Sequence, residues 1–261
     1  MKKIVAVFFV IGGIMTLLNL SGCKKVLDYV KHHPGGIADN CKITQLTDFW
    51  YYGDGDHIVY DTSDFVYNNY GDLLRINRRS QTNFDFIPPY FDQAFVYDNK
   101  HRVIAFIDGI LSHDHTSNVG FTWHTYTYVG NSTIIDSVFD YPDGDYTVSF
   151  RPTSYNSVKV STLTLDGWGR VVKDSYLGET YKYDTNGNLI NPGVSYSNKT
   201  NIRQTNKAWM LIDRNYSINQ PLGEAAQFNN NNLPVKFNSN FGLYVGGYNY
   251  GSSAIVTYSC K

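Results

Sequence analysis

The stretch YDTNGNL at residues 183–189 carries the pattern that decides the fold, and three other stretches repeat it: YNNYGDL at 67–73, YDNKHRV at 97–103 and LDGWGRV at 165–171. Each copy has an aromatic or apolar residue, Asp or Asn, two variable residues, Gly or a substitute, a polar residue and an aliphatic one. Weaker copies begin at Tyr128, with Ile134 as the aliphatic residue, and at Phe228, with Pro234 in that place. The chain therefore consists largely of similar short units.

Each unit has the residue types that a tight hairpin turn requires. The Asp or Asn side chain can accept hydrogen bonds from backbone N–H groups two residues further on, which starts a turn. Gly supplies a positive φ angle at the turn's exit, and Asn or His tolerates that angle next best. The flanking aromatic and aliphatic residues can then pair across two antiparallel strands. The units thus predict successive hairpins.

The composition supports the same fold class. The chain holds 22 Tyr, 15 Phe and 22 Gly, and its only glutamates are Glu179 and Glu224. Aromatic residues favour strands and Gly favours turns, whereas strong helix formers are sparse. We therefore predict an all-β protein, a series of antiparallel hairpins forming an extended, twisted or curled sheet. Residues 103–107 are predicted to form a fully buried strand.

The first 22 residues have the order of a secretory signal peptide. Lys2 and Lys3 precede an uncharged apolar run over residues 4–18, and small residues follow it. The run is short for a membrane-spanning helix, which needs about 20 residues.

Leu20-Ser21-Gly22-Cys23 resembles the lipobox of bacterial lipoproteins. The resemblance implies that Cys23 becomes the first mature residue and carries acyl chains such as palmitate, which anchor it to a membrane. We expect a signal peptide over 1–22, a lipidated tether over 23–40 and an all-β domain over 41–261. Lys24 follows Cys23 without an acidic run, so we expect the periplasmic face of the outer membrane rather than the cell surface.

Two cysteines remain once Cys23 is lipidated. Cys41 and Cys260 lie near opposite ends of the mature chain. An oxidising envelope permits a disulfide between them, and the alternative is two independent buried thiols.

The repeated units resemble the YD repeats of RHS-type proteins, in the short degenerate form found in lipoproteins of Bacteroidota. Residues 205–217, followed by Leu233-Pro234, resemble the C-terminal part of such lipoproteins. The resemblance covers most of residues 41–260 and supplies no catalytic residues. Full RHS repeats build a large encapsulating shell, so a related fragment would form a closed, curled sheet around a cavity.

Few residues suggest catalysis or metal binding. His113 and His115 could face one metal ion from an extended segment, but zinc needs three or four ligands and a polar loop is the default interpretation. A glycan hydrolase would have to recruit Asp carboxylates, most of which the turns already explain. The chain has no G-x-S-x-G, no H-E-x-x-H and no phosphate-binding loop. We expect no cofactor.

Two residues are candidates for binding and modification. Trp168 stands between two glycines inside a turn copy, so it is the tryptophan that we expect to be exposed and the candidate ligand-binding residue. Asp136-Ser137-Val138 resembles the O-glycosylation acceptor pattern of exported Bacteroidota proteins, which makes Ser137 a candidate modification site.

These features favour a non-enzymatic envelope lipoprotein with a scaffold, adhesion or ligand-binding β domain. The chain carries 22 Lys and Arg against 23 Asp and Glu, and this balance gives no reason to expect nucleic acid as a partner. The expected partners are the membrane, through the lipid anchor, and a glycan or another envelope protein. The alternatives are an envelope glycan hydrolase that uses Asp carboxylates and an RHS-shell-related fragment.

Overall fold

The computed structural model describes residues 38, 40–52, 57–80, 91–111, 118–141, 154–238, 243–246, 248–250 and 253–260. The predicted signal peptide, Cys23, most of the tether, His113 and His115 lie outside these residues.

The described chain is mostly β-strand with almost no helix, in agreement with the predicted class. The strands of the first part are β1 Cys41–Tyr52, β2 His57–Tyr67, β3 Leu73–Ser80, β4 Phe91–Tyr97, β5 Val103–Leu111, β6 Asn118–Val129, β7 Thr133–Tyr141, β8 Ser157–Leu165, β9 Val171–Asp174 and β10 Glu179–Thr180. The later elements are β11 Tyr196–Thr200, the 3-10 helix η1 Ile202–Thr205, the helix α2 Lys207–Ile212, β12 Asn219–Pro221, β13 Ala225–Phe228, β14 Pro234–Phe237, β15 Leu243–Val245, β16 Tyr248–Tyr250 and β17 Ile255–Cys260.

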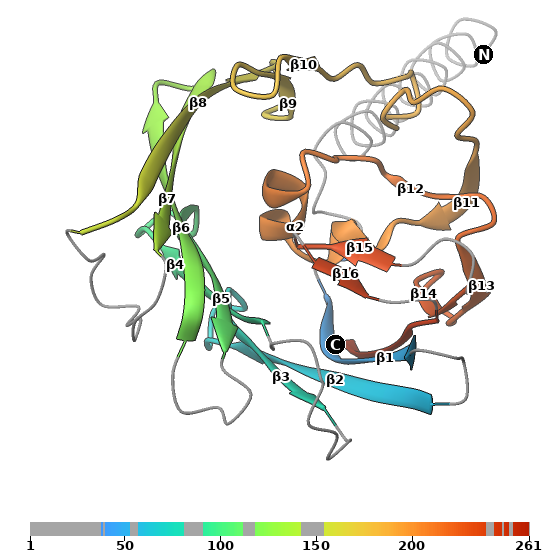
Figure 1. The fold of residues 1–261 in the computed structure, drawn as a ribbon. Helices are drawn as coiled ribbons and strands as arrows, with labels where there is room; N and C mark the ends of the chain where they lie inside the picture. Colours follow the sequence, from blue (N-terminus) through green and yellow to red (C-terminus); the bar gives the residue numbers. More distant parts are fainter. Residues whose placement is uncertain are drawn as a thin grey trace, which may run out of the picture.

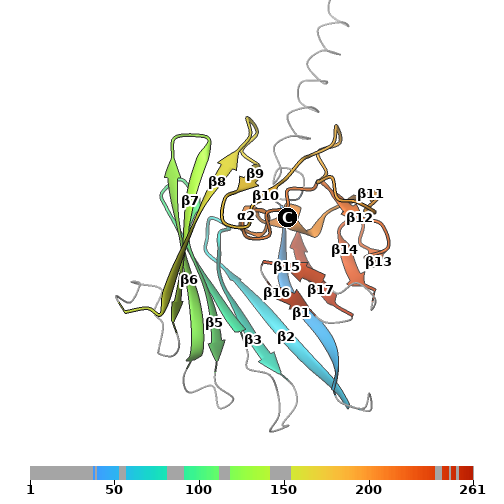
Figure 2. The ribbon, with the colours of Figure 1, turned by 45° about the horizontal axis from the view of Figure 1, so that its top comes forward.

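Thirteen of these strands form one antiparallel sheet in the order β10-β9-β8-β7-β6-β5-β4-β3-β2-β1-β17-β14-β13. The strands β1 to β10 follow one another in chain order, as successive hairpins require. The C-terminal strand β17 then pairs with β1 and brings β14 and β13 with it. The sheet curls around η1 and α2, with its two ends on opposite sides of them (Figures 1 and 2).

The sheet is open, because the two strands at its ends, β10 and β13, each pair with only one neighbour. Its concave face is packed with apolar side chains from the sheet and from α2. Within the described residues the chain therefore does not form the closed, hollow shell that relatedness to an RHS shell would require. The observed form is a curled sheet around a filled core.

Trp209 of α2 stands at the centre of this core. Its side chain is fully buried, and its ring meets Phe65 of β2 and Phe95 of β4 edge to face, each at 5.9 Å between centroids. Gly246, after β15, approaches the ring so closely that a Cβ there would lie 2.6 Å from it. Three distant parts of the chain thus meet on one indole ring.

The sequence analysis missed α2, although its boundaries have local causes. The Asn206 side chain accepts a hydrogen bond from the Ala208 N–H at 2.9 Å, which caps the helix start. The helix ends where Arg214 adopts a positive φ of 52°. The Asn residue ahead of a short apolar run was the available signal.

The strand predicted over residues 103–107 is confirmed as the start of β5, and of these five residues all but the half-buried Ile104 are buried. Its side chains nevertheless serve two cores, and a register shift beside Val103 puts that residue on the same face as Phe106. Val103 and Phe106 join the concave core, whereas Ala105 and Ile107 belong to a second cluster with Phe121, Trp123, Phe139 and Tyr141 of β6 and β7. The run is apolar throughout because both faces of the sheet are covered here.

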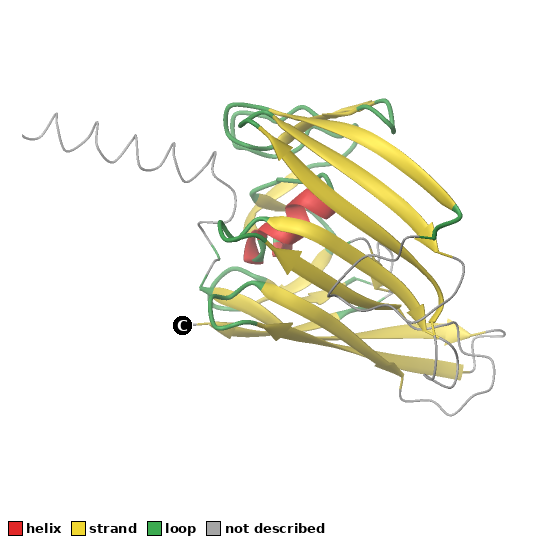
Figure 3. Ribbon diagram, turned by 90° about the vertical axis from the view of Figure 1, so that its left-hand side faces the viewer, coloured by secondary structure: helices red, strands yellow, loops and turns green. Residues whose placement is uncertain are grey.

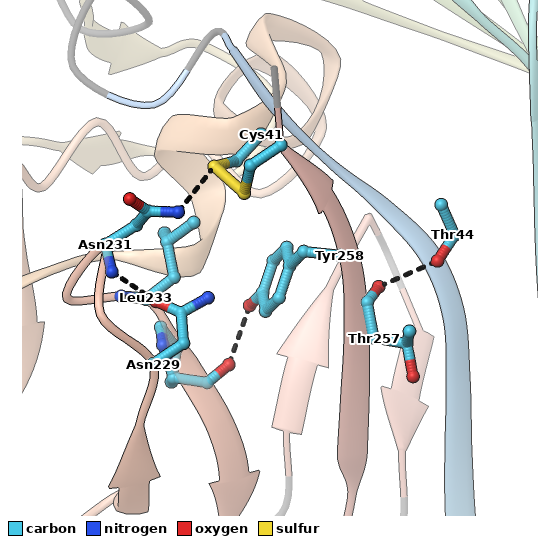
Figure 4. The surroundings of a disulfide bond; sticks show 9 residues. Cys41, Thr44, Asn229, Asn231, Leu233, Thr257 and Tyr258 are labelled. Carbon is cyan, nitrogen blue, oxygen red and sulfur yellow. Dashed lines mark hydrogen bonds between the residues drawn. A yellow bond between two sulfur atoms is a disulfide. The ribbon is translucent and has the colours of Figure 1, made fainter.

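Cys41 and Cys260 form a disulfide, with sulfur atoms 2.04 Å apart (Figure 4). The two residues are directly paired across β1 and β17. The bond therefore joins β1 to β17 and closes a loop between two residues with a sequence separation of 219.

We predict that the double variant Cys41→Ser/Cys260→Ser loses about 5 kcal/mol of stability, because the unfolded chain regains the entropy of a very long loop. Denaturant unfolding of both proteins measures this loss. Reduction of the wild type should produce the same shift, and the double variant should not respond to reductant. Equal midpoints for the oxidised wild type and the double variant would contradict the prediction.

Candidate functional site

Five of the six turn copies share one hydrogen-bonded geometry. At Asn68, Asp98, Asp166, Asp184 and Asn229, the side-chain oxygen accepts from the N–H groups two and four residues further on, at 2.8–3.0 Å. The residue three positions on has a positive φ in each case: Gly71, His101, Gly169, Gly187 and Asn232. The predicted use of His and Asn in place of Gly is confirmed.

The two copies that look weaker in the sequence differ from each other in the structure. The copy at Phe228 has the full geometry although four asparagines fill its turn. The copy at Tyr128 has Val129 where the others have Asp or Asn, and its positive φ falls on Gly130 instead. Only a side chain that can accept hydrogen bonds makes this turn.

Four of these turns, β2–β3, β4–β5, β6–β7 and β8–β9, lie on one rim of the curled sheet, because every second connection of an antiparallel meander returns to the same end. The pairing of β14 with β17 and of β13 with β14 brings the turn at 229–233 to that rim, and the contacts of Tyr183 with Arg170 and Val171 place the turn at 184–188 beside it. We call residues 68–72, 98–102, 130–132, 166–170, 184–188 and 229–233 the turn rim. Figure 3 shows the described turns of this rim gathered on the side where the C-terminus also lies. The Cys41–Cys260 bond lies on this rim, since β1 begins and β17 ends there.

Arginines connect neighbouring units along the rim. Arg102 donates from Nε to Asp98 of its own turn at 2.8 Å and lies over the Tyr128 ring of the next unit, 4.1 Å from its centroid. Arg170 repeats this arrangement with Asp166 at 2.8 Å and Tyr183 at 4.2 Å. The positive charge thus neutralises the turn carboxylate and covers an aromatic face.

Tyrosine hydroxyls add a second connection between units. Tyr128 donates to the Val103 carbonyl at 3.0 Å, and Tyr183 donates to the Val171 carbonyl at 3.3 Å. Tyr258 of β17 donates to the Pro234 carbonyl at 2.7 Å. In each case the acceptor is the aliphatic position of an adjacent unit, so the spacing of Tyr and aliphatic residues fixes how units stack.

The turn rim presents exposed aromatic rings. Trp168 is 41% exposed in the β8–β9 turn, whereas Trp123 and Trp209 are buried, as the sequence analysis expected. Tyr70, in the β2–β3 turn, is 81% exposed and was not singled out from the sequence. Its ring lies 5.2 Å from that of His101, whose Nδ1 is 2.8 Å from Asp72.

Ser137 lies within β7, between β6 and β8, and is half-buried. Its carbonyl is 3.5 Å from the Thr125 hydroxyl. The candidate modification site is therefore on a strand in the interior of the sheet and not on a loop.

The concave face holds a buried ionic network centred on Arg214. Its guanidinium contacts Asp136 of β7 at 2.6 Å and Asp174 of β9 at 3.3 Å, and it donates to the Leu211 carbonyl at the end of α2. His124 of β6 places Nδ1 3.1 Å from Asp136. The network joins the helix to three strands. No local sequence pattern predicts it, because its members are far apart in the chain.

The arrangement of this network does not assemble a nucleophile. The Ser161 hydroxyl is 2.5 Å from Asp174, and this carboxylate, not His124, is the group that it contacts. Burial alone would raise the pKa of Asp174, but the Ser161 hydroxyl, the Leu177 N–H and Arg214 outweigh burial, so the pKa lies below its ordinary value. Asp174 is thus an ionised partner of Arg214.

A second polar row crosses the same face nearer the opposite rim. Arg78 donates to Gln93 at 3.2 Å, and Gln93 donates to the Gly246 carbonyl at 2.9 Å. Asp108 of β5 is paired with Gln93 across the strands. Burial raises the pKa of Asp108, and Arg78, Gln93 and His124 only partly offset this effect.

Within the described residues, no three His, Cys, Asp or Glu side chains gather as a metal site would require. The same part of the chain contains no helix long and apolar enough to cross a membrane. No protein-family model matches the chain, and no curated protein matches it either.

We predict that Asp108→Asn raises the stability at neutral pH by on the order of 1 kcal/mol. A raised carboxyl pKa means that wild-type stability falls as pH rises from the ordinary Asp value of about 3.9 through the folded-state value, because the buried group must ionise. Thermal unfolding at a series of pH values measures the difference between the two proteins, which should disappear at acidic pH.

Asp98→Asn is the matched control, and it should change the stability at neutral pH in the opposite direction, by lowering it. Backbone and side-chain hydrogen bonds from Arg102 lower the pKa of Asp98 to about 2. Its stabilising contribution is therefore present above the ordinary pKa and is lost as pH falls towards 2. Asn can still accept the two backbone hydrogen bonds of the turn, as at Asn68, so the substitution removes the charge and its side-chain bond with Arg102. A destabilised Asp108→Asn at neutral pH would contradict our assignment.

Proposed function

We propose that the protein is exported, lipidated at Cys23 and held at a membrane, where its β domain acts as a binding or scaffold module without catalytic activity. The proposal of a non-catalytic role rests on the observation that interior carboxylates of the domain are paired with arginines. Asp136 and Asp174 are used by Arg214, and Arg203 pairs with Asp213 at 2.7 Å. The Arg214 pairs hold the end of α2 against the sheet, and the Arg203–Asp213 pair joins η1 to the end of α2.

The export part of the proposal comes from the sequence. The charged start, the apolar run and the Leu-Ser-Gly-Cys stretch are those of a lipoprotein signal. A disulfide between Cys41 and Cys260 suits an oxidising compartment. Lys24, with no acidic run after it, favours the periplasmic face of the outer membrane over the cell surface, and protease treatment of intact cells tests which face is correct.

One observation favours the alternative of an envelope glycan hydrolase. Asp108 has the raised pKa that a general acid needs. Hydrolysis of a glycosidic bond also needs a second carboxylate at about 5–10 Å. Turnover of any envelope glycan by the purified wild type, abolished in Asp108→Asn, would select this alternative over the binding module.

We predict that Cys23→Ala abolishes acylation. In bacteria grown with labelled palmitate, the wild type should carry the label, and mass spectrometry should find Cys23 as the first mature residue. The variant should be unlabelled because it lacks the sulfur that accepts the lipid. Ser21→Ala is the matched control, since it keeps a small residue before the cysteine, and it should be labelled normally. Label that persists in Cys23→Ala would refute the anchor.

A further inference from the structure

We infer that the turn rim is a membrane-docking surface, which lies against the phospholipid headgroups of the membrane that holds the lipid anchor. The inference rests on the proposed lipidation of Cys23 and adds to it an orientation of the whole domain. Four features of the described residues support it.

The first feature is where the tether joins the domain. Ala38 and Cys41 are buried against Leu233 of the last rim turn, and the disulfide fixes Cys41 to Cys260 (Figure 4). Fourteen residues, 24–37, separate Cys23 from Ala38. A segment of that length can reach at most about 50 Å. The tether therefore enters the domain at the turn rim, which is the part of the domain joined most directly to the proposed anchor.

The second feature is the kind of side chain exposed there. Tyr70 and Trp168 project from two rim turns, and Val129 is exposed beside the β6–β7 turn. Tyr and Trp are enriched at membrane interfaces because their rings are apolar and their N–H or O–H groups stay hydrated.

The third feature is charge. Turn carboxylates would repel anionic headgroups, but Arg102 and Arg170 pair with Asp98 and Asp166. Lys42 lies beside Gly71 on the same rim, and exposed Lys100 occupies the β4–β5 turn. Acids paired with arginine, together with the nearby Lys42 and the exposed Lys100, suit a neutral or anionic lipid surface.

The fourth feature is the distance along the rim between the turns that carry Tyr70 and Trp168. The turns that carry Tyr70 and Trp168 flank β3 and β8, and β4 to β7 lie between these strands. At about 4.8 Å per strand, the turns are separated by roughly 24 Å along the sheet. One small sugar cannot contact both rings, whereas a planar bilayer meets a whole rim at once.

The fluorescence of Trp168 can report whether the turn rim lies against the membrane. The full-length lipidated protein would be reconstituted into vesicles of phosphatidylethanolamine and phosphatidylglycerol, with and without brominated acyl chains. We expect the brominated lipid to quench tryptophan emission in the wild type, and we expect Trp168→Phe to lose that quenching. Trp123 and Trp209 are buried and out of reach, and Trp50 is present in both proteins, so the difference reports on Trp168.

Tyr70→Ser tests whether the turns of the rim contact the membrane together. Removing this ring should lessen the quenching of Trp168, although the two turns are on different hairpins. Tyr176→Ser is the matched control, because Tyr176 is 56% exposed in the β9–β10 turn, which lies away from the rim. It should leave quenching unchanged.

The outcomes separate the inference from the proposed anchor. Wild-type protein that fails to float with the vesicles would show that the anchor is absent. Protein that floats but has the same quenching as Trp168→Phe would overturn the docking rim alone. Protection of Trp168 from a soluble quencher by added polysaccharide, without quenching by the brominated lipid, would also overturn it and assign the rim to a glycan.

Discussion

The packing of Trp209 against the concave face of the sheet is the constraint on which the rest of the structure depends. A sheet of thirteen strands that curls exposes one large apolar face, and α2 covers it from within. The indole contacts Phe65 and Phe95 from two hairpins and excludes any side chain at position 246. Arg214 then fixes the end of the helix to β7 and β9 through Asp136 and Asp174. The same contacts between α2 and the sheet therefore fill the core and hold the curvature of the sheet.

The repeated units build the sheet, and the ends of the domain hold it. The Arg102–Tyr128 and Arg170–Tyr183 contacts each join one unit to the next, so the stacking of these pairs of units is encoded locally. At the ends, β17 returns to β1 and the disulfide joins them on the turn rim. The same rim receives the tether, and this coincidence connects the fold to the proposed position at a membrane.

The part of the fold that the sequence predicts is the part with local causes. An Asp or Asn with Gly, Asn or His three residues later specifies its turn without help from the rest of the chain, and all five such copies form it. Cysteine number led to the Cys41–Cys260 pair for a similarly simple reason. By contrast, Arg214 reaches Asp136 across 78 residues, and no local pattern marks either residue. Asp108 looks like any other strand Asp until its burial is known. Tyr70 stands in a recognised turn, but only its exposure distinguishes it from a core ring.

Native-state hydrogen exchange at low denaturant concentrations tests most directly whether α2 and the sheet form one unit. If Trp209 holds the curl, the slowest amides of α2, β2, β4 and β5 open together, with one free energy and one denaturant dependence. Trp209→Phe, which leaves part of the core unfilled, should lower that shared free energy by about the same amount in all four elements. Exchange in which α2 opens at a much lower free energy while β2, β4 and β5 keep their protection would show that the sheet curls without the helix, and would contradict this account.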